Sequence, residues 1–361
     1  MIIKKLELSN FRNYGTLEVE LDKGINIFYG DNAQGKTNIL EALYMACTTK
    51  SPKATRDSEV IRFGEKEAHL RMYVEKGGID RRIDMHLKKN SPKGVALDGI
   101  PLAKASEIYV MMNIISFSPD DLAIIKSGPS ERRSFIDMAL SQLDKMYLYS
   151  LSSYKKALNQ RNILLKQIKK NDELENTLSV WDEQLTKFGG YIIGKRAEYV
   201  KEIGERASVI HSRLSGGKES LTLKYLPNVS TDMLSAELGF SHEKDIVMKS
   251  TTVGPHRDDI GFDINSDEAR KFGSQGQQRT VALTLKLAEI EIVKEKTGDK
   301  PVLLLDDVLS ELDRSRQTEL LGNIEDIQTV ITCTGLEEFV NGRIKLDRIY
   351  KVSEGRVSAA E

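Results

Sequence analysis

The segment from Gly30 to Thr37 restricts the fold of this chain more than any other feature. Its residues, Gly30-Asp31-Asn32-Ala33-Gln34-Gly35-Lys36-Thr37, fit the pattern G-x-x-x-x-G-K-[ST] of a phosphate-binding loop. The apolar residues 25–29 before the loop predict a strand, and residues 37–45 after it predict a helix. Phosphate oxygens bind where backbone N–H groups and a helix N-terminus converge, so this setting suits the motif. We therefore expect an α/β fold that binds a nucleoside triphosphate.

The residue types of the loop suggest how it would hold ATP and Mg²⁺. Gly30 and Gly35 let the backbone turn tightly and approach the phosphates. Lys36 would contact the β- and γ-phosphates and assist catalysis, and the Thr37 hydroxyl would ligate Mg²⁺. The predicted nucleotide-binding set also contains Asp31, Asn32, Ala33, Gln34 and Asn38. The alternative is a glycine-rich turn that matches the pattern by chance, and the flanking strand and helix make that alternative rarer.

Composition limits the class of protein. A chain of 361 residues is longer than a single core usually requires, which favours two domains or one elaborated domain. The net charge of −1 means that any nucleic-acid surface must be a local patch. Cys47 and Cys333 lie far apart and form no metal-binding spacing, which suits a reducing compartment. No apolar stretch has the length of a signal peptide or a membrane span, so we expect a cytoplasmic protein.

A second chemical signal lies near residue 305. Residues 302–307 read Val-Leu-Leu-Leu-Asp-Asp, the pattern of a buried parallel strand that ends in two carboxylates. Triphosphatases hold Mg²⁺ with a carboxylate at the carboxyl end of a central strand beside the phosphate loop. We assign Asp306 to Mg²⁺ and Asp307 to orienting the attacking water. The alternative is an ordinary strand end with a solvated acid pair.

A third signal opens the helix predicted after residue 274. The segment Gly273-Ser274-Gln275-Gly276-Gln277-Gln278-Arg279 lies roughly 30 residues before the carboxylate strand. It resembles the signature motif of ABC-type ATPases, which contacts the γ-phosphate bound to the opposite subunit; Ser274, Gly276 and Gln277 would make that contact. The alternative is a serine N-cap beside a glycine turn. Residues 214–218, Leu-Ser-Gly-Gly-Lys, look closer to the signature but follow a helical run, so we interpret them as a helix C-cap.

The rest of the pattern predicts two lobes. Residues 2–9 with 16–22, and 69–75 with 81–88, alternate as β-hairpins. Apolar residues spaced by three and four from Leu143 to Ile210 predict a helical hairpin, broken at Asn171-Asp172, with arms of roughly 45 Å at 1.5 Å per residue. Residues 220–226 and 246–253 look like strands.

With these motifs in order, the chain resembles the RecF family, bacterial recombination mediators with an SMC-like ATPase head. The resemblance runs end to end and is carried by the segments Asn10–Tyr14, Phe117–Leu122, Arg132–Asp137 and Gly254–Asp259. It implies an α/β, ABC/SMC-type P-loop ATPase head with a mainly helical second lobe. The ATPase lobe would comprise residues 1–115 and 261–361, and the second lobe residues 116–260.

The resemblance also implies a mechanism in DNA repair and replication. ATP would join two monomers, with Ser274 and Gln277 of each closing the other's site. The homodimer would hold duplex, gapped or junction DNA, and RecO and RecR would then help to load RecA. Many ABC-type ATPases have Glu where this chain has Asp307, and the shorter acid lies farther from the water. We therefore predict a weak, DNA-dependent ATPase that turns over below about 1 per second.

Basic residues in two places remain open to interpretation. Residues 49–56 depart from the Lys-Ser-Phe-Arg usual in the family, so Lys53 or Arg56 could supply a basic contact there, or both could be solvated. A basic stripe on the predicted helical hairpin could neutralise DNA phosphates, although charged helix faces are usually only solvated. The stripe consists of Lys155, Lys156, Arg161, Lys166, Lys169 and Lys170.

Other classes of protein share part of this pattern. An ABC transporter ATPase subunit has the three nucleotide motifs but docks on a membrane partner, and the Asn10–Tyr14 and 254–259 segments argue against it. A long-armed SMC protein needs hundreds of heptad residues that this chain lacks. A third possibility is that nucleotide binding only regulates protein assembly.

Overall fold

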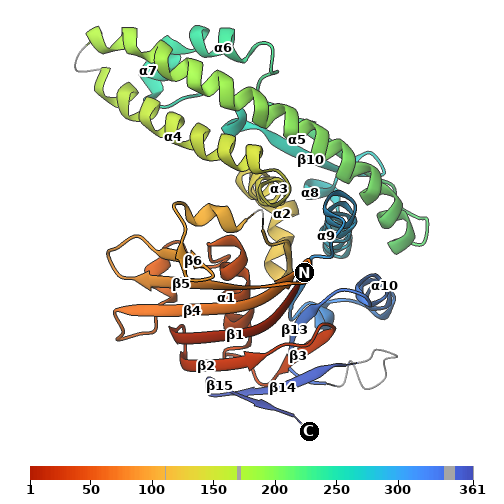
Figure 1. The fold of residues 1–361 in the computed structure, drawn as a ribbon. Coiled ribbons are helices and arrows are strands. Elements are labelled where there is room, and N and C mark those ends of the chain that lie inside the picture. The colour runs from red at the N-terminus through yellow and green to blue at the C-terminus, as the bar shows by residue number, and fades with distance from the viewer. Residues whose placement is uncertain (110, 169–171, 337–345, 361) are drawn as a thin grey trace. The chain divides into compact units, whose positions relative to one another are not determined.

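The computed structural model describes residues 1–109, 111–168, 172–336 and 346–360, and the chain forms two compact units (Figure 1). The first unit contains Met1–Asp121 and Glu289–Glu361, and the second contains Leu122–Ala288. Residues 261–288, which the sequence analysis placed in the ATPase lobe, thus fall in the second compact unit. The lobe boundaries expected from the sequence stay a prediction.

One antiparallel sheet of the first unit is built from hairpins. Its strand order is β2-β1-β4-β5-β6-β7. The predicted hairpins are confirmed, and Gly77 and Gly78 take the positive φ angles that the turn between β4 and β5 requires. Apolar residues alternate with polar ones along the strands, so one face lies in the core and the other faces solvent. The strands are β1 (Ile2–Phe11), β2 (Tyr14–Glu20), β4 (Glu67–Lys76), β5 (Ile79–Lys88), β6 (Gly94–Leu97) and β7 (Ile100–Pro101).

The other sheet of the first unit carries the nucleotide motifs. Its order is β15-β14-β3-β13-β12-β8, and the five strands from β14 to β8 are parallel. Helix α1 (Lys36–Thr48) contacts strands of both sheets, and a shared apolar core surrounds it. The predicted strands before the loop and at residues 302–306 are confirmed. The strands are β3 (Ile25–Tyr29), β8 (Ile114–Phe117), β12 (Val302–Asp306), β13 (Thr329–Cys333), β14 (Arg348–Ser353) and β15 (Arg356–Ala359).

The second unit is mainly helical, as expected. Helices α4 (Lys145–Ile168) and α5 (Leu178–Leu214) lie side by side as the predicted helical hairpin (Figure 1). A three-stranded antiparallel sheet packs on α5 through β9 (Leu221–Leu226), with β10 (Asp259–Ile264) and β11 (Asp267–Glu268) beyond it. The other α-helices described in this unit are α2 (Ala123–Lys126), α3 (Pro129–Leu143), α6 (Leu234–Phe240), α7 (His242–Met248), α8 (Ala269–Phe272) and α9 (Gln275–Thr297), which continues into the first unit.

One predicted strand is wrong. Residues 246–248 belong to α7, and Lys249 ends that helix in the left-handed conformation. Short apolar runs such as Ile246-Val247-Met248 occur in both helices and strands, so their composition did not distinguish the two. None of the helices in the described part of the chain combines the length and apolar character needed to span a bilayer.

Two segments that carry the family resemblance form a buried ion network in the second unit. Arg196 from α5 binds Asp137 at 2.8 Å and Asp258 at 2.9 Å, and Asp258 is fully buried. Arg132 donates two hydrogen bonds to the carboxylate of Asp259. Burial of a charge is costly unless the charge is paired and hydrogen-bonded, so these residues hold α3, α5 and β10 in one arrangement.

Candidate nucleotide-binding site

The loop from Gly30 to Thr37 connects β3 to α1 through backbone conformations that favour glycine. Gly30 has a φ of 149°, and a Cβ there would lie 2.2 Å from the carbonyl oxygen of Val352. Gly35 has a φ of 112°, and its Cβ would lie 2.8 Å from the hydroxyl of Tyr14. Backbone atoms leave no room for a side chain at Gly30, and the Asn13 and Tyr14 side chains leave none at Gly35, so both positions favour glycine by space as well as by φ. The loop residues Asp31, Asn32 and Ala33 are exposed.

The Lys36 ammonium lies inside this loop. It donates hydrogen bonds to the carbonyl oxygens of Gly30 at 2.5 Å and Asp31 at 2.7 Å, and the residue is only 7% exposed. Lys36 is also the first residue of α1, where the helix dipole and free N–H groups favour an anion. Positive charge and backbone donors are thus collected at one place, as phosphate binding requires.

Thr37 and Asp306 meet at the carboxyl edge of the parallel sheet. The Thr37 hydroxyl donates to Asp306 Oδ1 at 2.7 Å, and the Thr332 hydroxyl donates to the same oxygen at 2.8 Å. Strands β3, β13 and β12 are consecutive in the sheet, so their carboxyl ends lie together. A hydroxyl and a carboxylate are hard oxygen donors, the type that Mg²⁺ prefers, so these two residues fit the ion. The structure thus brings together the two residues that the sequence assigns to Mg²⁺, and the metal-binding role itself stays a prediction.

Asp307 follows in an unusual backbone conformation. Its φ is 55°, in the left-handed region, and its N–H donates to the Thr332 carbonyl oxygen at 3.1 Å. The Ser310 hydroxyl donates to the Asp307 carboxylate at 3.3 Å. Sequence reasoning missed Thr332, which contacts both acidic residues. Strain of this kind occurs at functional sites, and here it directs the chain away from the strand immediately after Asp306.

The turn between β1 and β2 supports the loop from outside. Asn13 donates to the Gln34 carbonyl oxygen at 3.0 Å and accepts a hydrogen bond from the Asn38 side chain at 2.8 Å. The Tyr14 hydroxyl donates to the Gly35 carbonyl oxygen at 3.0 Å, and burial raises the pKa of Tyr14. The sequence identified residues 10–14 only as a family resemblance. The resemblance marked this segment as important. It did not show that Asn13 and Tyr14 contact the phosphate loop.

Arg12 of the same turn anchors helix α1. Its guanidinium makes a two-pronged contact with Glu41, at 2.7 Å and 2.6 Å, and the Glu41 side chain is almost fully buried. Hydrogen bonding to Glu41 raises the pKa of Arg12. Bidentate arginine–carboxylate pairs fix geometry as well as charge, so this contact sets the position of α1 relative to the turn.

Lys53 is the basic residue of the 49–56 segment that reaches the site. Its ammonium lies 3.3 Å from Asp306 Oδ2, and its side chain is 41% exposed. The structure thus brings Lys53 to the carboxylate, while Arg56 is exposed at the start of the next short helix, η1 (Asp57–Val60).

The signature candidates lie at the start of α9. The Ser274 hydroxyl accepts from the Gln277 N–H at 3.2 Å, and the Gln277 side chain accepts from the Ser274 N–H at 2.8 Å. This reciprocal pair is a capping box, so the capping role considered from the sequence is present. Ser274 and Gly276 are nevertheless exposed at a helix N-terminus. The rival segment ends α5, with Gly216 and Gly217 at positive φ, which confirms its interpretation as a C-cap.

Arg161, one residue of the proposed DNA-binding stripe, cannot contact DNA because it is buried. Arg161 is fully buried and bonded to Asp182 at 2.7 Å and Asp245 at 2.6 Å, so it is unavailable to DNA. Its inclusion was wrong because helix periodicity does not show which partners fold over a residue. Three lysines of the stripe are exposed, Lys155, Lys156 and Lys166. Lys169 and Lys170 lie outside the described residues.

Comparisons with known proteins cover the whole chain. The family model described as "RecF/RecN/SMC N terminal domain" matches residues 2–358. The chain is 58% identical over 357 residues to the DNA replication and repair protein RecF of Lachnoclostridium phytofermentans, covering 99% of each. It is 55% identical over 361 residues to that of Agathobacter rectalis, covering 100% of each.

Solved structures agree with this relationship. The chain is similar to "the recombination mediator protein RecF-ATP in RecFOR pathway" with a TM-score of 0.92, 36% identity and coverage of 99% of this chain and 97% of the other. The corresponding RecF-ATPrS structure gives a TM-score of 0.91, 36% identity and coverage of 100% and 98%. An Smc head bound to the C-terminal winged-helix domain of ScpA, with a TM-score of 0.59, 20% identity and coverage of 100% and 97%, shares the fold.

Proposed function

The chain belongs to the RecF family of DNA replication and repair proteins, and from this premise we propose that it is an ATP-dependent DNA-binding protein of recombinational repair and replication restart. The observation that carries the proposal is the contact between Thr37 Oγ1 and Asp306 Oδ1 at 2.7 Å beside the Lys36 ammonium. This arrangement supports binding of ATP with Mg²⁺. The two similar structures, solved as RecF-ATP and RecF-ATPrS, support ATP as the nucleotide.

Each residue of the loop has a defined task in this proposal. Lys36 and the loop N–H groups, from Gly30 to Asn38, bind the phosphate oxygens. Thr37 and Asp306 hold Mg²⁺, which when bound offsets the negative charge that develops on the phosphates. Asp307 orients the attacking water and accepts its proton. Because its side chain is one methylene shorter than the Glu of many ABC-type ATPases, hydrolysis should be slow and act as a release step.

Dimerisation would convert nucleotide binding into DNA binding. Ser274, Gly276 and Gln277 are positioned at an exposed helix N-terminus that can meet the γ-phosphate held by a second copy. ATP would thereby join two copies, and the dimer would hold gapped or double-stranded DNA, with DNA in turn stimulating hydrolysis. In this proposal RecR and RecO act with the DNA-bound dimer and RecA is loaded afterwards.

Binding to a gapped duplex tests the proposal. Wild type and Ser274→Arg are compared at one salt concentration without nucleotide, with ADP and with ATP. We expect ATP to tighten binding for wild type and to have no effect on Ser274→Arg, because the arginine blocks the approach of the second copy. Ser91→Arg is a matched control, since it places the same charge on an exposed serine of the first unit that has no part in the nucleotide site. Equal binding with and without ATP by wild type would overturn the proposal.

A further inference from the structure

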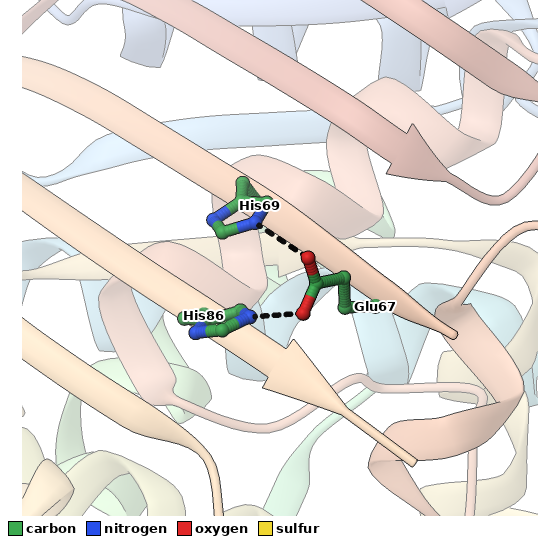
Figure 2. Close-up of side chains that lie close together, drawn as sticks. All are labelled: Glu67, His69 and His86. Carbon is green, nitrogen blue, oxygen red and sulfur yellow. Dashed lines mark hydrogen bonds and ion pairs between the residues drawn. The ribbon is translucent and has the colours of Figure 1, made fainter. Parts of the chain in front are cut away.

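Three metal-ligating side chains gather on the solvent face of the antiparallel sheet. Glu67 and His69 are two residues apart on β4, so their side chains leave the same face. His86 on β5 is paired directly opposite His69 across the two strands. Figure 2 shows the two imidazole rings and the carboxylate pointing toward one another. Strand β4 is hydrogen-bonded on both sides, to β1 and to β5, so the backbone that carries the group is rigid.

The ligand atoms converge on one point. One atom from each of the three side chains lies within 4.8 Å of the other two. His86 Nε2 is 3.1 Å from Glu67 Oε2, and His69 Nε2 is 3.9 Å from Glu67 Oε1. The rings are stacked, with centroids 4.2 Å apart and planes 12° apart, so both Nε2 atoms face the same carboxylate. Ligand atoms about 2.0–2.2 Å from a tetrahedral zinc ion lie roughly 3.4 Å from one another, close to these spacings.

We propose that Glu67, His69 and His86 bind one divalent transition-metal ion, with Zn²⁺ the best match to the ligand set. Two imidazole nitrogens and one carboxylate oxygen suit Zn²⁺, whereas Mg²⁺ and Ca²⁺ prefer sites made only of oxygen. The side chains are 44–53% exposed, so a water molecule can complete the coordination. The two histidines also line a groove of about 640 Å³ on this face, which gives the ion access from solvent.

The local charges are compatible with a cation. Arg71 lies on the same face but is engaged by Asp84 at 2.6 Å and Glu7 at 3.4 Å. Lys88 is exposed and lies directly opposite Glu67 across the two strands, so its positive charge competes with a metal ion for that carboxylate. Replacing Lys88 should therefore strengthen metal binding, whereas a site formed elsewhere would not respond to it.

Calorimetric titration of Zn²⁺ into the full chain, with excess Mg²⁺ and no nucleotide, tests the site. We expect one ion per chain, binding at least about tenfold weaker for His69→Ala and for His86→Ala, and tighter binding for Lys88→Ala. His242→Ala is the matched control, since it removes a partly exposed histidine that pairs with Asp182 in the second unit. Circular dichroism checks that each variant is folded.

Binding of Cu²⁺ gives a second test, which identifies the ligands of the metal and does not depend on its affinity. The electron paramagnetic resonance spectrum of the Cu²⁺-loaded chain should show two imidazole nitrogens, and one in either histidine variant. Zinc binding that is unchanged in both histidine variants, or no binding by folded wild type, would overturn the proposal.

Discussion

The side chains of Thr37 and Asp306 lie 269 positions apart in the chain, yet the threonine hydroxyl donates a 2.7 Å hydrogen bond to the aspartate Oδ1. The contact exists because β3 and β12 are parallel strands with only β13 between them, so the loop after β3 opens at the edge where β12 ends. Thr332 at the end of β13 donates to the same oxygen from the intervening strand. Three consecutive strand ends thus build the proposed Mg²⁺ site.

The Asp306→Asn substitution tests this site while preserving side-chain shape. The amide oxygen can still accept from Thr37, but the negative charge that would hold Mg²⁺ is gone. We expect Mg²⁺-dependent phosphate release to fall by roughly 100-fold, a loss of about 2.7 kcal/mol in transition-state stabilisation. Asp80→Asn, an exposed acid paired with Lys4, serves as the control. Activity of the Asp306 variant within about threefold of wild type would exclude this role for Asp306.

The Asn13→Ala substitution tests whether the β1–β2 turn supports the phosphate loop. It removes one hydrogen bond to the Gln34 carbonyl oxygen and one from Asn38, with no change in the loop's own sequence. At about 1 kcal/mol for each bond, we expect ATP affinity to fall by roughly tenfold or more. Fluorescent-nucleotide titration measures it, with Asn159→Ala on the exposed face of α4 as the control. Unchanged affinity would mean that the loop holds its shape without Asn13.

Much of this site could be predicted from local sequence motifs and their order in the chain, whereas the contacts between distant segments could not. The loop and the carboxylate strand were predictable because each motif is local, and parallel strand ends meet at one edge of a sheet. The contacts of Asn13 and Thr332 were not, since each depends on which distant segment lies beside it. The burial of Arg161 depends on Asp245, which lies 84 positions further along the chain. The helix at 246–248 was missed because short apolar runs fit either periodicity.

The Arg161→Met substitution tests the buried ion pairs of the second unit. Methionine keeps the packing volume similar but leaves Asp245, which is fully buried, without its cationic partner. Breaking a buried pair in this way costs about 3–5 kcal/mol, so thermal unfolding of the second unit should begin roughly 10 °C lower. Lys166→Met on the same helix is exposed and should change stability by less than about 0.5 kcal/mol. Equal melting temperatures for the two variants would contradict this account.

His256 makes the second unit sensitive to acid. Its Nδ1 accepts from the Tyr154 hydroxyl at 2.7 Å, and its Nε2 donates to the Thr251 carbonyl oxygen at 3.0 Å, so the neutral ring is satisfied. Burial lowers the pKa of His256 to about 4 from an ordinary 6.5. As the pH falls, His256 is therefore protonated in the unfolded chain before it is protonated in the folded chain. The stability that the neutral, buried ring contributes is fully present above pH 6.5 and is lost as the pH falls toward 4.

Urea unfolding across this pH range measures the effect. The free energy of unfolding of wild type should decrease by no more than about 3 kcal/mol between neutral pH and the folded pKa, and His256→Gln should lack that component. Both proteins keep the remaining carboxylates, so the difference between the two curves isolates the histidine. Parallel curves for wild type and the variant would show that His256 does not set this dependence.

The most direct test of the central claim, that ATP is bound between the loop of one copy and the signature segment of another, is a mixing experiment. Lys36→Met disables the loop and Ser274→Arg disables the signature, so neither variant alone should hydrolyse ATP or bind gapped DNA in an ATP-dependent way. In mixed dimers, one site combines the intact loop of the Ser274→Arg copy with the intact signature of the Lys36→Met copy. We predict that mixing restores part of the ATP hydrolysis and ATP-dependent DNA binding, and a mixture as inactive as either variant alone would contradict the account.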